Sequence, residues 1–149
     1  MKIDHKVDKT AWGAGPWQAE PDRKEWKDPA TGLPCLAHRN EGDGNWCGYV
    51  AVAPGHPAHG KDYDDVAADV HGGLTYAGKC SGHICHVPAP GEPDNVYWLG
   101  FDCHHWNDLA PGYHARHPDM PAFKEETYRT LGFVEAECAS LAAQLHAMQ

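Results

Sequence analysis

The chain has 149 residues, and its 12 Lys and Arg residues against 21 Asp and Glu residues give a formal net charge of −9. This length is typical of one domain that buries a core without disulfide cross-links or an obligate metal. An acidic chain repels phosphate backbones, so we expect no sequence-independent binding to nucleic acid. The absence of a long apolar run excludes a membrane-spanning class and predicts no membrane partner.

The first ten residues alternate charges and lack the apolar stretch of a secretory signal, which predicts a cytoplasmic protein. In that compartment we expect the six cysteines to be reduced thiols. We interpret 1–149 as a single domain in three parts. These are an irregular Trp-rich arm at 1–44, a sheet core at 45–110 and a C-terminal helix at 123–148.

Within the sheet core, β-prone residues bounded by turn residues predict three strands, and an acidic start followed by alanines predicts one short helix. The expected strands are 46–53, 70–77 and 96–103, the helix is 62–69, and the loops are 78–95 and 108–121. In the C-terminal helix, apolar residues recur every three or four positions, as an amphipathic helix requires. The fold class is therefore α+β: a small antiparallel sheet of three or more strands with the helix packed on one face.

Alternation along a strand predicts which side chains face the helix. In 96–103, one face carries Tyr97, Leu99, Phe101 and Cys103, which should meet the helix, and the other carries Val96, Trp98, Gly100 and Asp102. In 70–77, Val70, Leu74 and Tyr76 should face the core, with His71, Gly73, Thr75 and Ala77 on the other side.

If these two strands are neighbours, their outer face is a polar ligand cleft. His71, Thr75, Trp98 and Asp102 would line it above bare backbone at Gly73 and Gly100. Glycine in the middle of a strand either lets a ligand approach the backbone or marks a bulge. Both interpretations are open, and so is coverage of this face by the Trp-rich arm.

The densest group of chemical side chains follows the third strand, in 102–108. Asp102, His105 and Asp108 are spaced by three, so one helical turn would direct them to a common point. With His71, they could hold a divalent metal, zinc being the first choice, and leave a position open for water. A metal-free polar pocket and purely structural hydrogen bonding are the alternatives, because the pattern is short.

A second group, in 80–86, contains Cys80, Cys85 and His86. It resembles half of a structural zinc site, but no second ligand pair follows at the usual spacing. The alternative is a hairpin-like loop with buried thiols. Nucleophilic catalysis by Cys85 or Cys103 is a further alternative, although the adjacent histidines would point away on a strand.

The chain resembles a widespread family of small uncharacterised proteins of tailed phages and prophages. The motifs that carry the resemblance are GPW, EPD, TGLPCL, WCGYV, GHP, DYDD, VHGGLTY, ICHVP, WLGFDCHH with Asp108, and YRTL. The resemblance implies a phage or prophage origin and an intracellular setting, without a catalytic assignment. His104 stands where the family pattern GFDC-x-H-x-x-D has a small residue, which favours His105 and Asp108 as site residues.

These observations together predict a phage-type accessory protein with a His/Asp-lined cleft. Its chemistry would be metal-assisted hydrolysis of a small phosphorylated or nucleotide-like substrate. Asp102, His105 and Asp108 would hold the metal, and His71, Asp102 and His105 would act in catalysis, with Gly73, Thr75, Trp98 and Gly100 binding the ligand. Two alternatives remain. One is a non-enzymatic binder of a small molecule such as a nucleotide signal of host defence. The other is an acidic inhibitor of a host protein.

Overall fold

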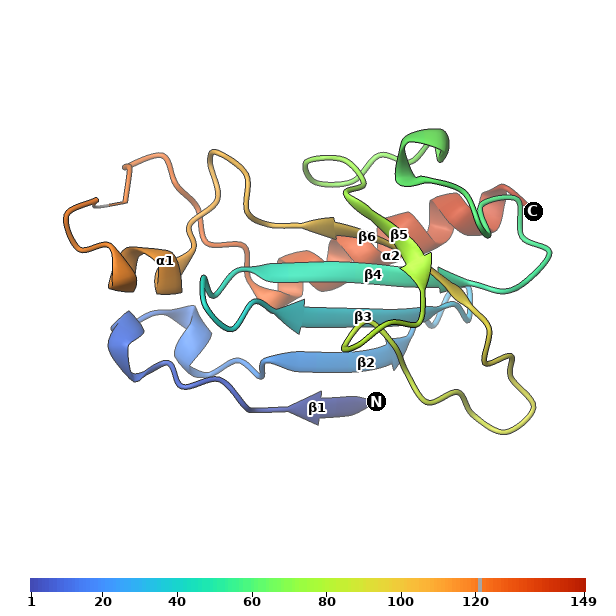
Figure 1. Cartoon of the computed structure of the whole chain (residues 1–149), viewed down its shortest axis with the longest axis horizontal. Coiled ribbons are helices and arrows are strands. Elements are labelled where there is room, and N and C mark those ends of the chain that lie inside the picture. The colour runs from blue at the N-terminus through green and yellow to red at the C-terminus, as the bar shows by residue number, and fades with distance from the viewer. Residues whose placement is uncertain (121) are drawn as a thin grey trace.

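A six-stranded antiparallel sheet forms the centre of the protein in a computed structural model that describes residues 1–120 and 122–149 (Figure 1). The strands are β1 (Lys2–Asp4), β2 (Arg23–Lys27), β3 (Pro34–Arg39), β4 (Trp46–Val52), β5 (Tyr76–Lys79) and β6 (Tyr97–Asp102). They lie in the order β1-β2-β3-β4-β6-β5. The α+β class with a sheet of three or more strands is therefore confirmed.

The long C-terminal helix α2 (Leu131–Ala147) packs on one face of the sheet, as predicted, and lies behind the sheet in Figure 1. It begins eight residues later than the predicted 123 because Thr130 is its N-cap, whose Oγ1 accepts a hydrogen bond from the Phe133 backbone N at 3.2 Å. The preceding Thr127 instead forms a β-bridge with Asp108.

Alternation along β6 is confirmed. Tyr97, Leu99, Phe101 and Cys103 belong to the core shared with α2. Trp98 lies on the opposite, helix-free face in a second, smaller core with Leu36 and Tyr49. Both faces of the central strands are thus buried, one by α2 and one by the long loop before β6.

The second predicted strand, 70–77, is wrong in its first half. Gly72 and Gly73 have φ values of +69° and +82°, which ends any extended strand, and β5 begins only at Tyr76. Val70 and Leu74 do pack in the core with α2, but Tyr76 lies on the helix-free face against Tyr49.

Three further predictions need correction. The segment 62–69 contains only a 3₁₀ turn, η3 (Tyr63–Asp65). The segment 108–121 contains a short helix, α1 (Pro111–Arg116), and its last residue, Pro121, lies outside the described residues. The N-terminal arm is confirmed but is shorter than 1–44, because β1, β2 and β3 lie inside that range. The irregular part of the arm contains the 3₁₀ turns η1 (Thr10–Trp12) and η2 (Pro16–Gln18).

A buried ionic cluster joins the arm to the sheet and to the start of α2. The Arg39 side chain is 0% exposed, and its guanidinium donates to Asp22 Oδ1 at 2.8 Å and to Glu20 Oε1 at 3.0 Å. Glu20 also accepts from the backbone N of Leu131 at 2.7 Å. The pKa of Asp22 lies below its usual value: burial would raise it, but hydrogen bonds from Lys9, Val7 and Arg39 outweigh that effect.

Candidate functional site

The structure brings His71 to the loop that follows β6, as the sequence predicts. His71 Nε2 lies 2.8 Å from Asp108 Oδ2, and Asp108 also accepts from Arg129 Nε at 2.8 Å and from the His105 backbone N at 3.0 Å. The Asp108 side chain is 1% exposed. Burial alone would raise the pKa of this carboxyl, but the hydrogen bonds from Arg129 and His71 hold it below its usual value.

The surroundings of His71 differ from the predicted cleft. Its backbone N donates to Glu137 on α2, and its ring packs edge-on against Phe133 of the same helix. His71 therefore lies beside the helix, whereas Trp98 lies on the opposite face of the sheet. The prediction that His71 and Trp98 share one face is wrong, because the turn at Gly72 and Gly73 removes residue 71 from any strand.

The predicted ligand floor is filled. Trp98 is fully buried beneath the loop that carries His86, whose ring lies edge-on to the indole. A Cβ at Gly100 would lie 2.3 Å from the Tyr49 ring, so this glycine accommodates an aromatic side chain of the protein itself. Thr75 is exposed, and its backbone N donates to the Gly100 carbonyl. Gly73, Thr75, Trp98 and Gly100 do not line a common cleft.

His105 and Asp102 form a second imidazole–carboxylate pair next to the first. Their Nε2 and Oδ1 atoms lie 3.0 Å apart, although not in hydrogen-bond geometry. The His105 ring is in edge contact with that of His71 and rests on Gly72. Across residues 1–120 and 122–149, no three His, Cys, Asp or Glu side chains are placed to hold a metal. Asp108 already pairs with the Arg129 guanidinium. Zinc at Asp102, His105 and Asp108 stays a prediction.

Two of the six cysteines depart from the expected reduced state, and the other four are free thiols. Cys80 and Cys85 form a disulfide within a hairpin-like loop, where Ser81 and Ile84 pair as a bridge. This disulfide leaves no thiolate pair for the alternative structural zinc site. Burial and nearby acidic groups raise the pKa of the Cys103 thiol, which argues against that side chain as a nucleophile.

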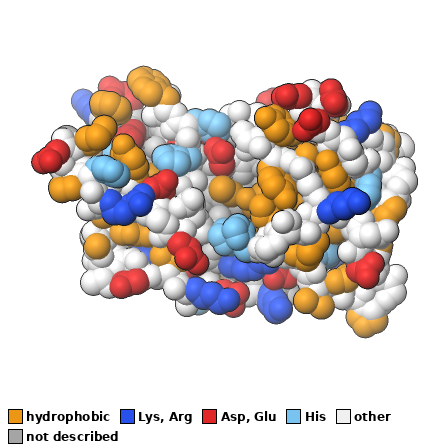
Figure 2. Space-filling view, viewed as in Figure 1, with side chains coloured by type: hydrophobic (Ala, Val, Ile, Leu, Met, Phe, Trp, Pro, Cys, Tyr) orange, Lys and Arg blue, Asp and Glu red, His pale blue; other side chains and the backbone are white. Residues whose placement is uncertain are grey.

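A polar cleft of about 740 Å³ opens on the helix-free face of the sheet, and sequence reasoning missed it. Its lining comes from Asp4, Lys6 and Val7, from Asp22 and Arg23, from 38–42, and from Cys47, Tyr49 and His83. Figure 2 shows histidine next to Lys and Arg side chains near the middle of this face. We refer to this set of residues as the polar cleft.

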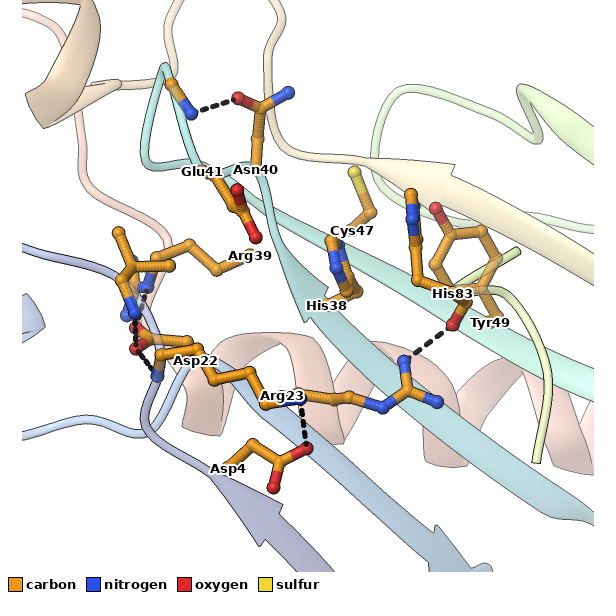
Figure 3. Close-up of a pocket in the computed structure, with 13 residues that line it drawn as sticks. Asp4, Asp22, Arg23, His38, Arg39, Asn40, Glu41, Cys47, Tyr49 and His83 are labelled. Carbon is orange, nitrogen blue, oxygen red and sulfur yellow. Dashed lines mark hydrogen bonds and ion pairs between the residues drawn. The ribbon is translucent and has the colours of Figure 1, made fainter. Parts of the chain in front are cut away.

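Strand register explains why these side chains meet. Arg23 of β2 pairs with His38 of β3, and His38 pairs with Cys47 of β4, so the three form a row across the sheet on one face. The Arg23 guanidinium donates to the His83 carbonyl at 2.6 Å (Figure 3). It also donates to the Cys85 carbonyl at 2.7 Å, and the two contacts fix the disulfide-closed loop at the edge of the cleft.

Two stacked imidazoles stand in the polar cleft. The rings of His38 and His83 are 4.0 Å apart between centroids and inclined by 13°. Burial lowers the pKa of His38 to about 4, and repulsion from His83 and Arg23 adds to this effect, so the ring is neutral at pH 7. In the part of the chain that the structure describes, neither ring makes a side-chain hydrogen bond to protein.

Apart from Glu41, the charged side chains that line the cleft are paired within the described part of the protein. Lys6 pairs with Asp4, Arg39 pairs with Asp22, and Arg23 pairs with Glu25. A ligand therefore meets the His38 and His83 rings, the Tyr49 phenol and these paired ions, with no surplus of positive charge among the described lining residues. This environment suits a polar molecule that presents hydrogen-bonding atoms and a flat ring more than one that depends on phosphate.

No family model matches the chain, and no curated protein or solved structure matches it. The resemblance to phage and prophage proteins stays a prediction that rests on the sequence motifs. Among the described residues, no helix has both the length and the apolar character needed to cross a membrane.

Proposed function

We propose that this protein binds a small, neutral polar molecule with a planar heteroaromatic ring, of the nucleoside class, in the polar cleft. The observation that carries the proposal is the stacked pair of His38 and His83, whose ring nitrogens have no protein partner within the described residues. Stacked rings offer a flat face, and the unpaired nitrogens offer hydrogen bonds to the edge of a ligand.

The volume of the cleft supports this class of ligand. Small-molecule sites enclose roughly 300–1,000 Å³, and the cleft, at about 740 Å³, falls within that range. The neutral state of His38 also matters, because an uncharged imidazole keeps one nitrogen as an acceptor and the other as a donor. Such a ring complements the amide and amino edges of a nucleobase.

The pairing of charges supports a nucleoside over a nucleotide. A phosphate would need cationic side chains that are not already engaged, and Arg23 has both of its terminal nitrogens on carbonyls and on Glu25. This part of the proposal departs from the phosphorylated substrate that the sequence predicts. It retains the alternative of a non-enzymatic binder of a nucleotide-like molecule.

The test is isothermal titration calorimetry with adenosine, cytidine, adenosine monophosphate and glucose as probes. We expect a nucleoside to bind, the monophosphate to bind no more tightly, and glucose, which has no flat ring, to give no heat. His83→Ala should weaken nucleoside binding about tenfold, equivalent to about 1.4 kcal/mol. His146→Ala is the matched control, because His146 is exposed on α2. Absence of nucleoside binding, or equal binding by the His83 variant, would refute the proposal.

A further inference from the structure

The loop that closes the polar cleft is itself cross-linked. Residues 80–86, here the disulfide loop, follow β5 directly and carry His83. The Cys80–Cys85 disulfide spans five positions of the chain and confines His83 between its two ends. A cross-link over so short a loop removes most of the conformations that the loop would otherwise sample.

Apart from the disulfide, the loop is held by hydrogen bonds, by ring stacking, and by Ile84 and His86, which pack against the buried core around Trp98. Backbone hydrogen bonds join Ser81 and Ile84 in both directions, at 3.1 and 3.0 Å. Arg23 donates to two loop carbonyls, and the His83 ring rests on His38. His83 is exposed and lies before the two anchors Ile84 and His86 in the chain, between the two cysteines, so its position depends on the cross-link.

The disulfide is accessible to a reductant. Cys80 is exposed and Cys85 is half-buried, whereas the free thiols of Cys35, Cys103 and Cys138 are buried and that of Cys47 is half-buried. The one exposed cysteine, Cys80, therefore belongs to the disulfide in the wall of the cleft. Exchange with a soluble thiol is governed by access to the sulfur and by the leaving thiol.

We propose that Cys80–Cys85 is a reversible thiol–disulfide exchange site whose co-substrate is a dithiol, and that its oxidation state controls the wall of the polar cleft. A thiolate of the dithiol attacks Cys80 Sγ, and a mixed disulfide forms while Cys85 leaves as a thiolate and takes up a proton. The second thiol of the dithiol then attacks the first sulfur of the same dithiol, which is bonded to Cys80 in the mixed disulfide. This step closes the disulfide of the reductant and releases Cys80 as a thiol. Two electrons and two protons pass to the protein, and the dithiol becomes a disulfide.

The consequence for the cleft follows from the contacts of His83. In the oxidised protein His83 lies on His38 and forms one side of the cleft, so the site is complete. In the reduced protein the Cys80–Cys85 bond no longer confines the loop. His83 then moves away from His38 and leaves the His38 ring exposed to water. This control of ligand binding rests on the proposed function, but the exchange and the loop movement do not.

The experiment is therefore made without ligand. The full-length protein is equilibrated with reduced and oxidised dithiothreitol, cysteine oxidation is measured by alkylation and mass spectrometry, and the C2–H signal of His38 is titrated by NMR. We expect Cys80 and Cys85 to become alkylated together while the protein stays folded. Reduction should raise the pKa of His38 from about 4 toward the roughly 6.5 of a free imidazole, and speed amide exchange in 81–86 about tenfold.

The double variant Cys80→Ser/Cys85→Ser is the matched control. Without any dithiol it should show the raised His38 pKa and fast exchange, and dithiothreitol should change neither. If the variant fails to fold, the comparison is made between the oxidised and the reduced wild-type protein. Equal His38 titration and equal amide exchange in the oxidised and reduced proteins would overturn the proposal, as would a disulfide that dithiothreitol reduces only after unfolding. Neither result affects the nucleoside titration, which tests the cleft separately.

Discussion

His71 and Asp108 are 37 positions apart in the chain, yet His71 Nε2 lies 2.8 Å from Asp108 Oδ2. The contact ties the turn before β5 to the loop after β6. Arg129, just before α2, completes the attachment by donating to the other carboxylate oxygen. One buried carboxylate thus connects three segments around the end of the sheet.

Asp108→Asn should lower the free energy of unfolding by about 3 kcal/mol at pH 7, because it leaves Arg129 and His71 without their anion. The folded-state pKa of Asp108 lies below its unfolded value, so its contribution is present above the unfolded pKa and is lost as the pH falls through the folded pKa. Urea unfolding of both proteins from pH 7 to pH 3 measures this. The two stabilities should converge toward acid, and a constant difference would contradict the assignment. Asp119→Asn, at an exposed position, is the control.

Arg39→Met tests the buried ionic cluster. The substitution keeps the volume of the stem but leaves Glu20 and Asp22 without the guanidinium between them. We expect a loss of about 3–5 kcal/mol in the free energy of unfolding, because breaking a buried ion pair strands its partners. The half-exposed Arg116 pairs with Asp43 at the surface, so Arg116→Met should cost under about 1 kcal/mol. Similar losses in the two variants would argue against a structural role for the cluster.

Gly72→Ala and Gly55→Ala form a matched pair, since both glycines have positive φ. A Cβ at residue 55 meets nothing within 4 Å, whereas a Cβ at residue 72 would lie 2.0 Å from His105 Nε2. Each variant should lose the roughly 1–2 kcal/mol that a left-handed conformation costs an L-residue. Only Gly72→Ala should also displace the His105 ring, which its NMR signal would show. An unmoved His105 signal would mean that the ring does not rest on Gly72.

His56→Ala tests a buried histidine outside the cleft. His56 Nδ1 accepts a hydrogen bond from the Ala58 backbone N at 2.9 Å, so Nε2 carries the proton that it donates to the Leu145 carbonyl at 2.7 Å. Removal of the His56 ring should lower the thermal midpoint and reduce the free energy of unfolding by about 1–3 kcal/mol, because a carbonyl in the last turn of α2 loses its hydrogen-bond donor. The exposed His146→Ala should leave the midpoint unchanged. Amide exchange near Leu145 should rise in the first variant alone.

The strands that show clear alternation could be predicted from the sequence. β4 and β6 combine β-prone residues with flanking turns, and the face of Leu99 and Phe101 follows from period two. β2 could not be predicted in this way, because its sequence, Arg-Lys-Glu-Trp-Lys, has no apolar period. Its pairing with β1 and β3 and the ion pairs of its charged side chains define it instead.

The site was only partly predictable, because most of its contacts depend on how the strands and loops are arranged in the fold. The approach of His71 to Asp108 follows from placing two neighbouring segments at one end of a sheet. The polar cleft depends on strand order: His38 meets Arg23 and Cys47 only because β3 lies between β2 and β4. His83 reaches His38 from a loop that a disulfide shapes, and no local pattern in the sequence encodes that contact.

The measurement that tests the central claim most directly is a residue-by-residue NMR map of the protein titrated with adenosine. The account predicts saturable shifts confined to the polar cleft, centred on His38, Tyr49 and His83, with the far side of the sheet under α2 unchanged. Shifts centred on His71 and Asp108, or no shift at all at the cleft, would contradict it.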